Sequence, residues 1–201
     1  MKTLYFDSRE EWLNARKGKI TGTTLKDILV KRGSGKKIGF YELIASRLAI
    51  EPDGEDPMER GLRLEDEAIQ RFSEKTGLEV DTSLVIWERE DNESIAISPD
   101  GFVGETIAVE VKCLSSARHL QAWLEQEVPD EYKDQALQYF VCNDKLETLY
   151  FCFFDPRIPS KDFFWIEVSR ESVQAKVDEY IEYEKNVLTE VNEIVATLSN
   201  F

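Results

Sequence analysis

Three side chains in one short segment have the types and spacing needed for metal-assisted hydrolysis. Asp100 lies in a Pro-Asp-Gly turn, and Glu110 and Lys112 follow it with one valine between them. Alternate residues of an extended strand project from the same face, so this carboxylate and this ammonium are neighbours. If the predicted strands 94–98 and 105–113 pair, Asp100 also lies beside Glu110. Carboxylates gathered at short range either take up protons or bind a divalent cation.

A third carboxylate, Glu65, comes from a helix predicted over residues 59–76. Glu65 precedes Ala68, Ile69 and Phe72 at helical spacing, and it therefore projects from their apolar stripe. A carboxylate on a core-facing stripe needs a partner. Judged alone, this residue is equally well a rim glutamate at the edge of the stripe. Joined to the other two carboxylates, it would complete an acidic cluster.

The composition restricts the metal that such a cluster could bind. His119 is the single histidine, and the three cysteines form no CxxC pair, which excludes histidine-based, zinc and iron–sulfur sites. Cys142 and Cys152 lie in apolar runs and are expected to be reduced core thiols. The ligands must therefore be oxygens, which suit Mg²⁺ or Mn²⁺. Lys112 beside such a metal would orient the attacking water and stabilise negative charge on a phosphate.

Glu-x-Lys strands and Pro-Asp-Gly turns are each commonplace and, taken singly, usually structural. Their combination with a preceding helical glutamate is more selective. It predicts the centre of a metal-dependent phosphodiester hydrolase.

Length and composition are those of a globular protein. The 201 residues, with 42% apolar and 32% charged residues, suit one domain over 1–201. No run is long enough to span a bilayer, and the N-terminus lacks a signal-peptide core, so we expect a cytoplasmic protein without a membrane partner.

Charge is distributed unevenly along the chain. The net charge is −15, yet residues 9–37 hold nine Lys or Arg against three acids. A basic N-terminal segment on an acidic body is compatible with a focused DNA-binding track. A solvated surface helix is the alternative.

Hydropathy patterns predict one α/β domain around a mixed sheet. Helices are expected over residues 8–17, 21–33, 39–50, 59–76 and 131–142 and from Arg170 onward, the last with an apolar stripe from Val173 to Val195. Strands are expected over residues 83–88, 94–98, 105–113, 146–154 and 163–168. Ser8 and Glu11 have the spacing of a capping box at the first helix.

Four motifs occur in the order seen in the PD-(D/E)xK nuclease superfamily. They are GxxxE from Gly61 to Glu65, SPDG, EVK, and QxxxY from Gln135 to Tyr139. More narrowly, the chain resembles the phage lambda exonuclease, or YqaJ-like viral recombinase, family. The segments "ARKGKITGTTL", "QALQYFV" and "FFDPRIP" extend this resemblance over most of the chain.

The resemblance implies a restriction-endonuclease-like core, with a mixed central β-sheet flanked by helices. It implies a magnesium-dependent exonuclease that digests duplex DNA from 5′ ends and uses two metal ions in each active site. The implied metal ligands are Asp100, Glu110, the main-chain carbonyl of Val111, and Glu65. Lys112 matches the catalytic lysine and Gln135 a glutamine that contacts the active-site region. By itself Gln135 could be a helix-surface amide, and Tyr139 a packing residue.

The family also holds the 5′-phosphate of its substrate, and three residues match that pocket. Arg16 matches the phosphate-binding arginine, Thr23 stands where the family has a serine, and Ser98 opens the SPDG turn. Without a phosphate-binding role, Arg16 could be a helix-end cation, Thr23 an N-cap and Ser98 a turn residue. Further DNA contacts are expected from Arg32, Lys36, Lys37 and the apolar Met58, which falls in a predicted loop.

The resemblance further implies a ring of three subunits around DNA, a phage single-strand annealing partner, and products that are mononucleotides and a 3′ overhang. Two rival functions stay open. One is an endonuclease of the same fold that cuts internally. The other is a catalytically silent DNA-binding or protein-interaction module.

Overall fold

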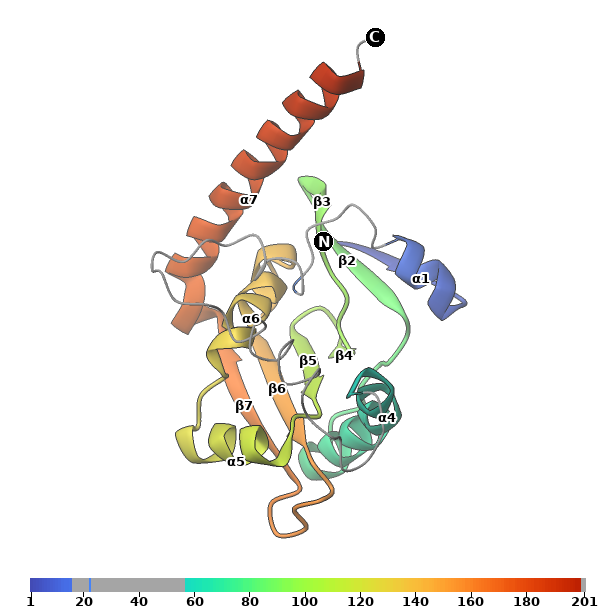
Figure 1. Ribbon diagram of the computed structural model, residues 1–201, viewed down its shortest axis with the longest axis vertical. Helices are drawn as coiled ribbons and strands as arrows, with labels where there is room; N and C mark the ends of the chain where they lie inside the picture. Colours follow the sequence, from blue (N-terminus) through green and yellow to red (C-terminus); the bar gives the residue numbers. More distant parts are fainter. Residues whose placement is uncertain (16–21, 23–56, 200–201) are drawn as a thin grey trace, which may run out of the picture.

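The computed structural model describes residues 1–15, 22 and 57–199. The helices of this part are α1 (Arg9–Ala15), α4 (Pro57–Thr76), α5 (Ser116–Glu125), α6 (Asp130–Cys142) and α7 (Arg170–Ser199). The strands are β1 (Lys2–Tyr5), β2 (Val85–Arg89), β3 (Asn92–Ile97), β4 (Gly101–Val103), β5 (Ile107–Lys112), β6 (Thr148–Phe154) and β7 (Phe163–Ser169). Figure 1 shows their arrangement. None of these described helices is long and apolar enough to cross a membrane.

The strands form two sheets. One has the order β1-β2-β3 with antiparallel pairs, and the other has the order β4-β5-β6-β7. In the second sheet β5 and β6 run parallel while the outer pairs are antiparallel. The parallel pair needs a crossover, and α5 and α6 lie in that connection. The predicted mixed α/β architecture is confirmed.

The pairing on which the position of Asp100 was made conditional does not occur. Strands 94–98 and 105–113 do not pair, because β3 belongs to the first sheet and β5 to the second. The chain turns after β3 at the SPDG segment and enters the short strand β4, which pairs with β5. A strand of three residues is too short to produce a recognisable alternation. The structure also adds β1 and α5, which the sequence patterns did not predict.

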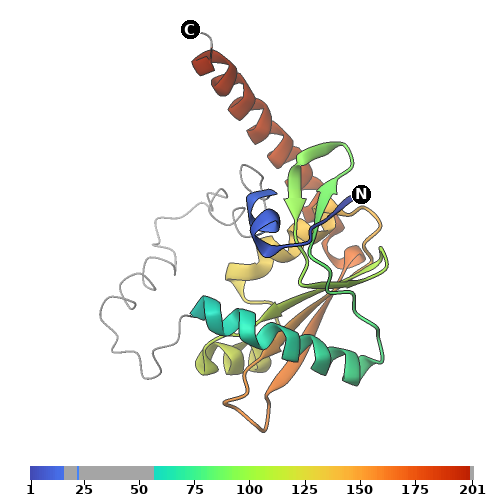
Figure 2. The ribbon, with the colours of Figure 1, turned by 90° about the vertical axis from the view of Figure 1, so that its right-hand side faces the viewer.

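Alternation along β5 assigns its two faces to different helices. Val109 and Val111 pack in one cluster with Leu64 and Phe72 of α4. Ala108 on the opposite face packs in a second cluster that includes residues of α6. Helix α4 thus covers one face of the four-stranded sheet and α6 the other (Figure 2). Glu110 and Lys112 belong to the face of Ala108.

Helix α6 lies between the two sheets. Trp87 of β2 meets Tyr139 of α6 edge to face, with ring centroids 6.3 Å apart. The opposite face of the three-stranded sheet carries Ile86 and Ala96, which pack against Trp12 of α1. In α1, the Ser8 hydroxyl accepts the Glu11 amide hydrogen at 3.3 Å, as the capping pattern predicted.

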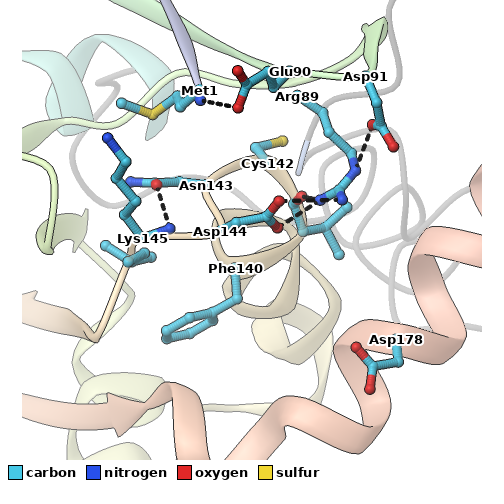
Figure 3. Close-up of polar contacts among 12 residues, drawn as sticks. Met1, Arg89, Glu90, Asp91, Phe140, Cys142, Asn143, Asp144, Lys145 and Asp178 are labelled. Carbon is cyan, nitrogen blue, oxygen red and sulfur yellow. Dashed lines mark hydrogen bonds and ion pairs between the residues drawn. The ribbon is translucent and has the colours of Figure 1, made fainter.

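Two arginines hold the C-terminal end of α6, and Figure 3 shows the contacts of the first, Arg89. Arg89 donates to the carbonyl of Val141 at 2.5 Å and to Asp144 at 2.9 Å. Arg170 donates to the carbonyl of Phe140 at 3.1 Å. The last carbonyls of a helix lack partners within it, so these guanidinium groups fix α6 at its end.

Helix α7 begins at Arg170 as predicted, but its apolar stripe is only partly covered. Val177 is buried, whereas Val191, further along the stripe, is 46% exposed. The C-terminal half of the helix projects beyond the sheets (Figure 1). The helical spacing of apolar residues therefore predicted the helix correctly. It did not predict how much of the apolar stripe is covered by other elements.

Candidate active site

The pairing of β4 with β5 brings Asp100 to Glu110. Gly101 pairs with Val109, so the preceding Asp100 lies opposite Glu110. The Asp100 carboxylate accepts the amide hydrogen of Val111 at 2.7 Å. A Cβ atom on Gly101 would lie 2.5 Å from a side-chain carbon of Val80. The glycine of the SPDG segment thus permits the close packing that places Asp100 here.

Glu110 is the most enclosed of the acidic residues at this site, with 2% of its surface exposed. Gln135 donates to one of its oxygens at 2.6 Å, and Lys112 forms an ion pair with the same oxygen. The Tyr139 hydroxyl donates to the other oxygen. Residues one helical turn apart share a face, so the QxxxY spacing directs both α6 side chains toward Glu110. A buried carboxylate requires partners of this kind.

Lys112 is held as a cation. Burial acts to lower the pKa of its ammonium, but the carboxylates of Glu110 and Asp100 raise it, and the net shift is upward. The Lys112 Nζ atom also lies 5.1 Å from the ring centroid of Tyr132 and 5.8 Å from that of Phe151. A charged ammonium can stabilise negative charge on a phosphate, but it cannot accept a proton.

The three predicted acids influence one another electrostatically. Burial raises the pKa of Asp100 well above its ordinary value, and the charges of Glu110 and Glu65 raise it further. Burial also raises the pKa of Glu65, opposed by the charge of Arg9 and reinforced by that of Glu110. Glu65 therefore adds its charge to the cluster although α4 packs on the opposite face of the sheet from Glu110.

The chemistry of the donors fits a hard divalent cation. Asp100 and Glu110 supply carboxylate oxygens, the ligands that Mg²⁺ prefers. The pKa of Asp100 is raised by burial and then by the neighbouring negative charges, and a bound cation would counter both effects. Among the described residues, no three His, Cys, Asp or Glu side chains stand close enough together to hold a metal as they are. Both Glu110 oxygens accept hydrogen bonds in this arrangement. The carbonyl of Val111 and the carboxylate of Glu65 remain predicted ligands.

The structure describes only some of the residues that were predicted to contact the 5′-phosphate or the DNA. Ser98 has a buried hydroxyl oxygen without a hydrogen-bond partner in the described part of the chain. Met58 lies in the first turn of α4 rather than in the predicted loop, and its side chain is outside the description. The remaining predicted phosphate and DNA contacts also lie outside the described residues; they are Arg16, Thr23, Arg32, Lys36 and Lys37.

Sequence reasoning missed three residues near the site. Tyr132 precedes Gln135 by one turn of α6, and this spacing could have indicated their shared face. A Cβ atom on Gly22 would lie 2.7 Å from the Gln135 side chain. Arg9 acts on Glu65 from α1. The last two proximities depend on tertiary packing and have no local signal.

The residues that carry these motifs match a known family model. The model, described as the YqaJ-like viral recombinase domain, matches residues 11–145. The uncharacterized protein YqaJ of Bacillus subtilis (strain 168) is 29% identical over 169 residues, which cover 82% of this chain and 51% of that protein. The chain thus spans about half the length of this relative.

Two solved structures of an alkaline exonuclease (LHK-Exo) from Laribacter hongkongensis share the fold. The complex of LHK-Exo with dAMP superposes with a TM-score of 0.70 and 26% identity, covering 94% of this chain and 100% of that one. A second LHK-Exo structure gives a TM-score of 0.64 at the same 26% identity, covering 90% and 99% of the two chains. The predicted fold class is confirmed by these matches.

Proposed function

The chain belongs to the YqaJ-like viral recombinase domain family, and from this membership and the geometry of the site we propose that it is a magnesium-dependent 5′-to-3′ exonuclease of double-stranded DNA. One observation carries the proposal. Lys112 and the acids Asp100 and Glu110 meet at the end of a β4–β5 pair, and Gln135 donates to Glu110 at 2.6 Å. The similarity to the alkaline exonuclease LHK-Exo supports a nuclease.

Each side chain of the site has a task in phosphodiester hydrolysis. Asp100 and Glu110 would hold Mg²⁺ or Mn²⁺, with the Val111 carbonyl and Glu65 as further ligands for two ions. When bound, the metal supplies Lewis-acid polarisation of the phosphate and a nucleophile at neutral pH. Lys112 stabilises the charge that develops on the attacked phosphate.

Gln135 and Tyr139 orient the oxygens of Glu110 through their hydrogen bonds. Such partners of a metal-binding carboxylate fix the direction in which its lone pairs point.

We assign the 5′-phosphate of the DNA end to a pocket that includes Ser98, whose buried hydroxyl has an unused hydrogen-bonding capacity within the described residues. Arg16 and Thr23 complete this assignment from the sequence pattern. Arg32, Lys36, Lys37 and Met58 would contact the duplex. Digestion would release 5′-mononucleotides and leave a 3′ overhang, which suits a phage single-strand annealing protein as the next partner. A ring of three subunits would make digestion processive.

The decisive experiment uses a linear duplex with a phosphate on one 5′ end and a hydroxyl on the other, each strand carrying a different label. With Mg²⁺, the phosphorylated strand should shorten first, and chelation by EDTA should stop the reaction. Lys112→Ala should abolish digestion. Lys145→Ala is the matched control, because Lys145 is also ion-paired with a glutamate but lies at the surface, 2.8 Å from Glu105.

Two outcomes would select the rival functions. Cleavage of a covalently closed plasmid would indicate an endonuclease, since an exonuclease leaves a circle intact. DNA binding without turnover in any divalent metal, and no effect of Lys112→Ala, would indicate a silent module.

A further inference from the structure

The ammonium of Lys112 lies between one carboxylate and two aromatic rings. Its Nζ atom forms an ion pair with Glu110 and lies 5.1 Å from the ring centroid of Tyr132 and 5.8 Å from that of Phe151. Both distances are within the range over which an ammonium is attracted to the negative face of an aromatic ring. Three partners, and not the carboxylate alone, therefore set the position of this ammonium.

The two rings are packed against each other in the core. Phe151 lies on β6 opposite Glu110 of β5 and has no exposed surface. Tyr132 lies in the first turn of α6 and packs against the cluster that contains Phe151. The centroids of the two rings are 6.0 Å apart. This packing restrains the Tyr132 ring beside Lys112.

Tyr132 belongs to the stripe of α6 that faces the acidic site. Tyr132, Gln135 and Tyr139 follow one another at intervals of three and four residues, so they project from one side of the helix. Gln135 and Tyr139 donate to Glu110, whereas Tyr132 contacts Lys112. One helical stripe thus holds both charged side chains on this face of β5.

A ring face holds an ammonium in a different way from a carboxylate. Lys112 has a flexible stem, and its charge-assisted hydrogen bond to Glu110 directs one N–H donor to an oxygen that we assign to the metal site. A neutral ring attracts the cation without occupying a hydrogen-bond donor, so the N–H groups remain available to phosphate oxygens. The Lys112 side chain is 18% exposed, which leaves it accessible to a substrate.

We propose that Tyr132 is a positioning residue for the nuclease reaction, whose ring face holds the Lys112 ammonium where it meets the attacked phosphate. The inference deepens the proposed function and rests on it, because it assumes that Lys112 acts on a phosphodiester. The aromatic face carries this role, and the Tyr132 hydroxyl does not.

Tyr132→Leu and Tyr132→Phe separate the ring face from the rest of the side chain. Leucine is apolar but has no π system, so kcat on a linear 5′-phosphorylated duplex should fall about threefold to thirtyfold, the range of a cation–π contact. KM should stay within about twofold of the wild type, because the effect concerns the transition state. Phenylalanine keeps the ring, and its kcat should stay within about twofold of the wild type.

Fluorination of the ring tests the same contact without a change of shape. Tyr132 is replaced by phenylalanine analogues that carry one, two or three fluorine atoms. Each fluorine withdraws electron density from the negative face of the ring and leaves its size nearly unchanged. The value of kcat should therefore fall stepwise along the series, while the Tm stays that of Tyr132→Phe. This series remains informative even if Tyr132→Leu does not fold.

A further readout needs neither metal nor turnover. Protons above a ring face resonate upfield because of the ring current, so the ε-methylene NMR signal of Lys112 should be shifted upfield in wild-type protein with isotope-labelled lysine in EDTA. Its loss in Lys112→Arg identifies the signal. The signal should move downfield in Tyr132→Leu and keep its position in Tyr132→Phe.

Trp123→Leu is the matched control. Trp123 on α5 makes a contact of the same kind, with the Nζ atom of Lys161 at 5.0 Å from its ring centroid. Removal of this ring should leave kcat and the Lys112 signal unchanged.

The possible results distinguish the two proposals. An active wild type whose kcat is unchanged in Tyr132→Leu, or is insensitive to ring fluorination, overturns the inference and leaves the exonuclease intact. A Lys112 signal that does not move in Tyr132→Leu has the same meaning. Equal losses of kcat in Tyr132→Phe and Tyr132→Leu would assign the role to the hydroxyl, which also overturns the inference. A wild type that digests no linear duplex with Mg²⁺ contradicts the proposed function, and the inference falls with it.

Discussion

Tyr139 on α6 donates its hydroxyl hydrogen to Glu110 on β5, and both side chains are buried. The aromatic ring of Tyr139 also belongs to the core between the two sheets. The residue thus joins the packing of α6 to the orientation of a carboxylate that we assign to the metal site.

Tyr139→Phe keeps the ring and removes the hydroxyl that donates to Glu110. We expect kcat to fall about tenfold to a hundredfold, the usual cost of losing a group that orients a metal ligand. Tyr180→Phe is the control, because Tyr180 donates to Asp134 of the same helix at 2.6 Å but outside the site. It should cost about 1 kcal/mol of unfolding free energy and leave kcat unchanged. Equal kcat values for the two variants would contradict the assignment.

Asp100→Asn should separate stability from activity. The Asp100 carboxyl has a raised pKa, so the folded protein binds its proton more tightly than the unfolded chain does. The free energy of unfolding therefore falls as the pH rises from the ordinary pKa of an aspartate toward the raised pKa of Asp100 in the folded protein. At pH 7 the ionised carboxylate destabilises the fold. The amide removes this penalty and can still accept the Val111 amide hydrogen. In EDTA at pH 7, Asp100→Asn should melt above the wild type.

The same variant tests the metal site. Mg²⁺ should raise the Tm of the wild type, because a ligand that binds only the folded state stabilises it, and should leave that of Asp100→Asn unchanged. Digestion of duplex DNA should be lost. Asp81→Asn, at an exposed carboxylate that accepts the Ser83 amide hydrogen, should behave as the wild type. An active Asp100→Asn enzyme with an unaltered response to Mg²⁺ would refute the metal assignment.

Gly22→Ala should disturb the site by crowding. The added methyl group would lie 2.6 Å from Ile97 Cδ1 and 2.7 Å from Gln135 Cγ, so one neighbour must move. Overpacking of this kind costs about 1–3 kcal/mol, and displacement of Gln135 should lower kcat. In Gly61→Ala, the added Cβ atom meets nothing within 4 Å. Since Gly61 lies within α4, alanine there should stabilise the fold by up to about 1 kcal/mol. The Tm and kcat of Gly22→Ala and Gly61→Ala, measured together with those of the wild type, test this prediction.

Glu184 on α7 should give the protein a pH-dependent stability unrelated to catalysis. Burial raises its pKa to about 7 from 4.5, against opposing effects of Gln138 and Arg89. Because the folded state holds this proton more tightly, stability should fall as the pH rises from 4.5 to 7, by on the order of 3 kcal/mol. Glu184→Gln should flatten the dependence and raise the Tm at pH 8. Glu182→Gln, at an exposed position of the same helix, should change neither.

Local pattern in the sequence determined much of this fold. The alternation at Glu110 and Lys112 assigned both side chains to one face of a strand, as β5 and its core partners show. Helical spacing identified α4, α6 and the start of α7, and α4 ends at Thr76 as predicted, followed by Gly77 with φ of 74°. These features follow from the repeat of a single element, which short stretches of sequence contain in full.

Tertiary structure alone decided which elements meet. It assigned β3 and β5 to different sheets, inserted β4 between them, and placed Gln135 and Tyr139 on Glu110. It also left Val191 exposed at the far end of a stripe that reads as continuous in sequence. A periodic pattern states which side of an element is apolar but not what covers that side, because the partner is set by packing between residues distant along the chain.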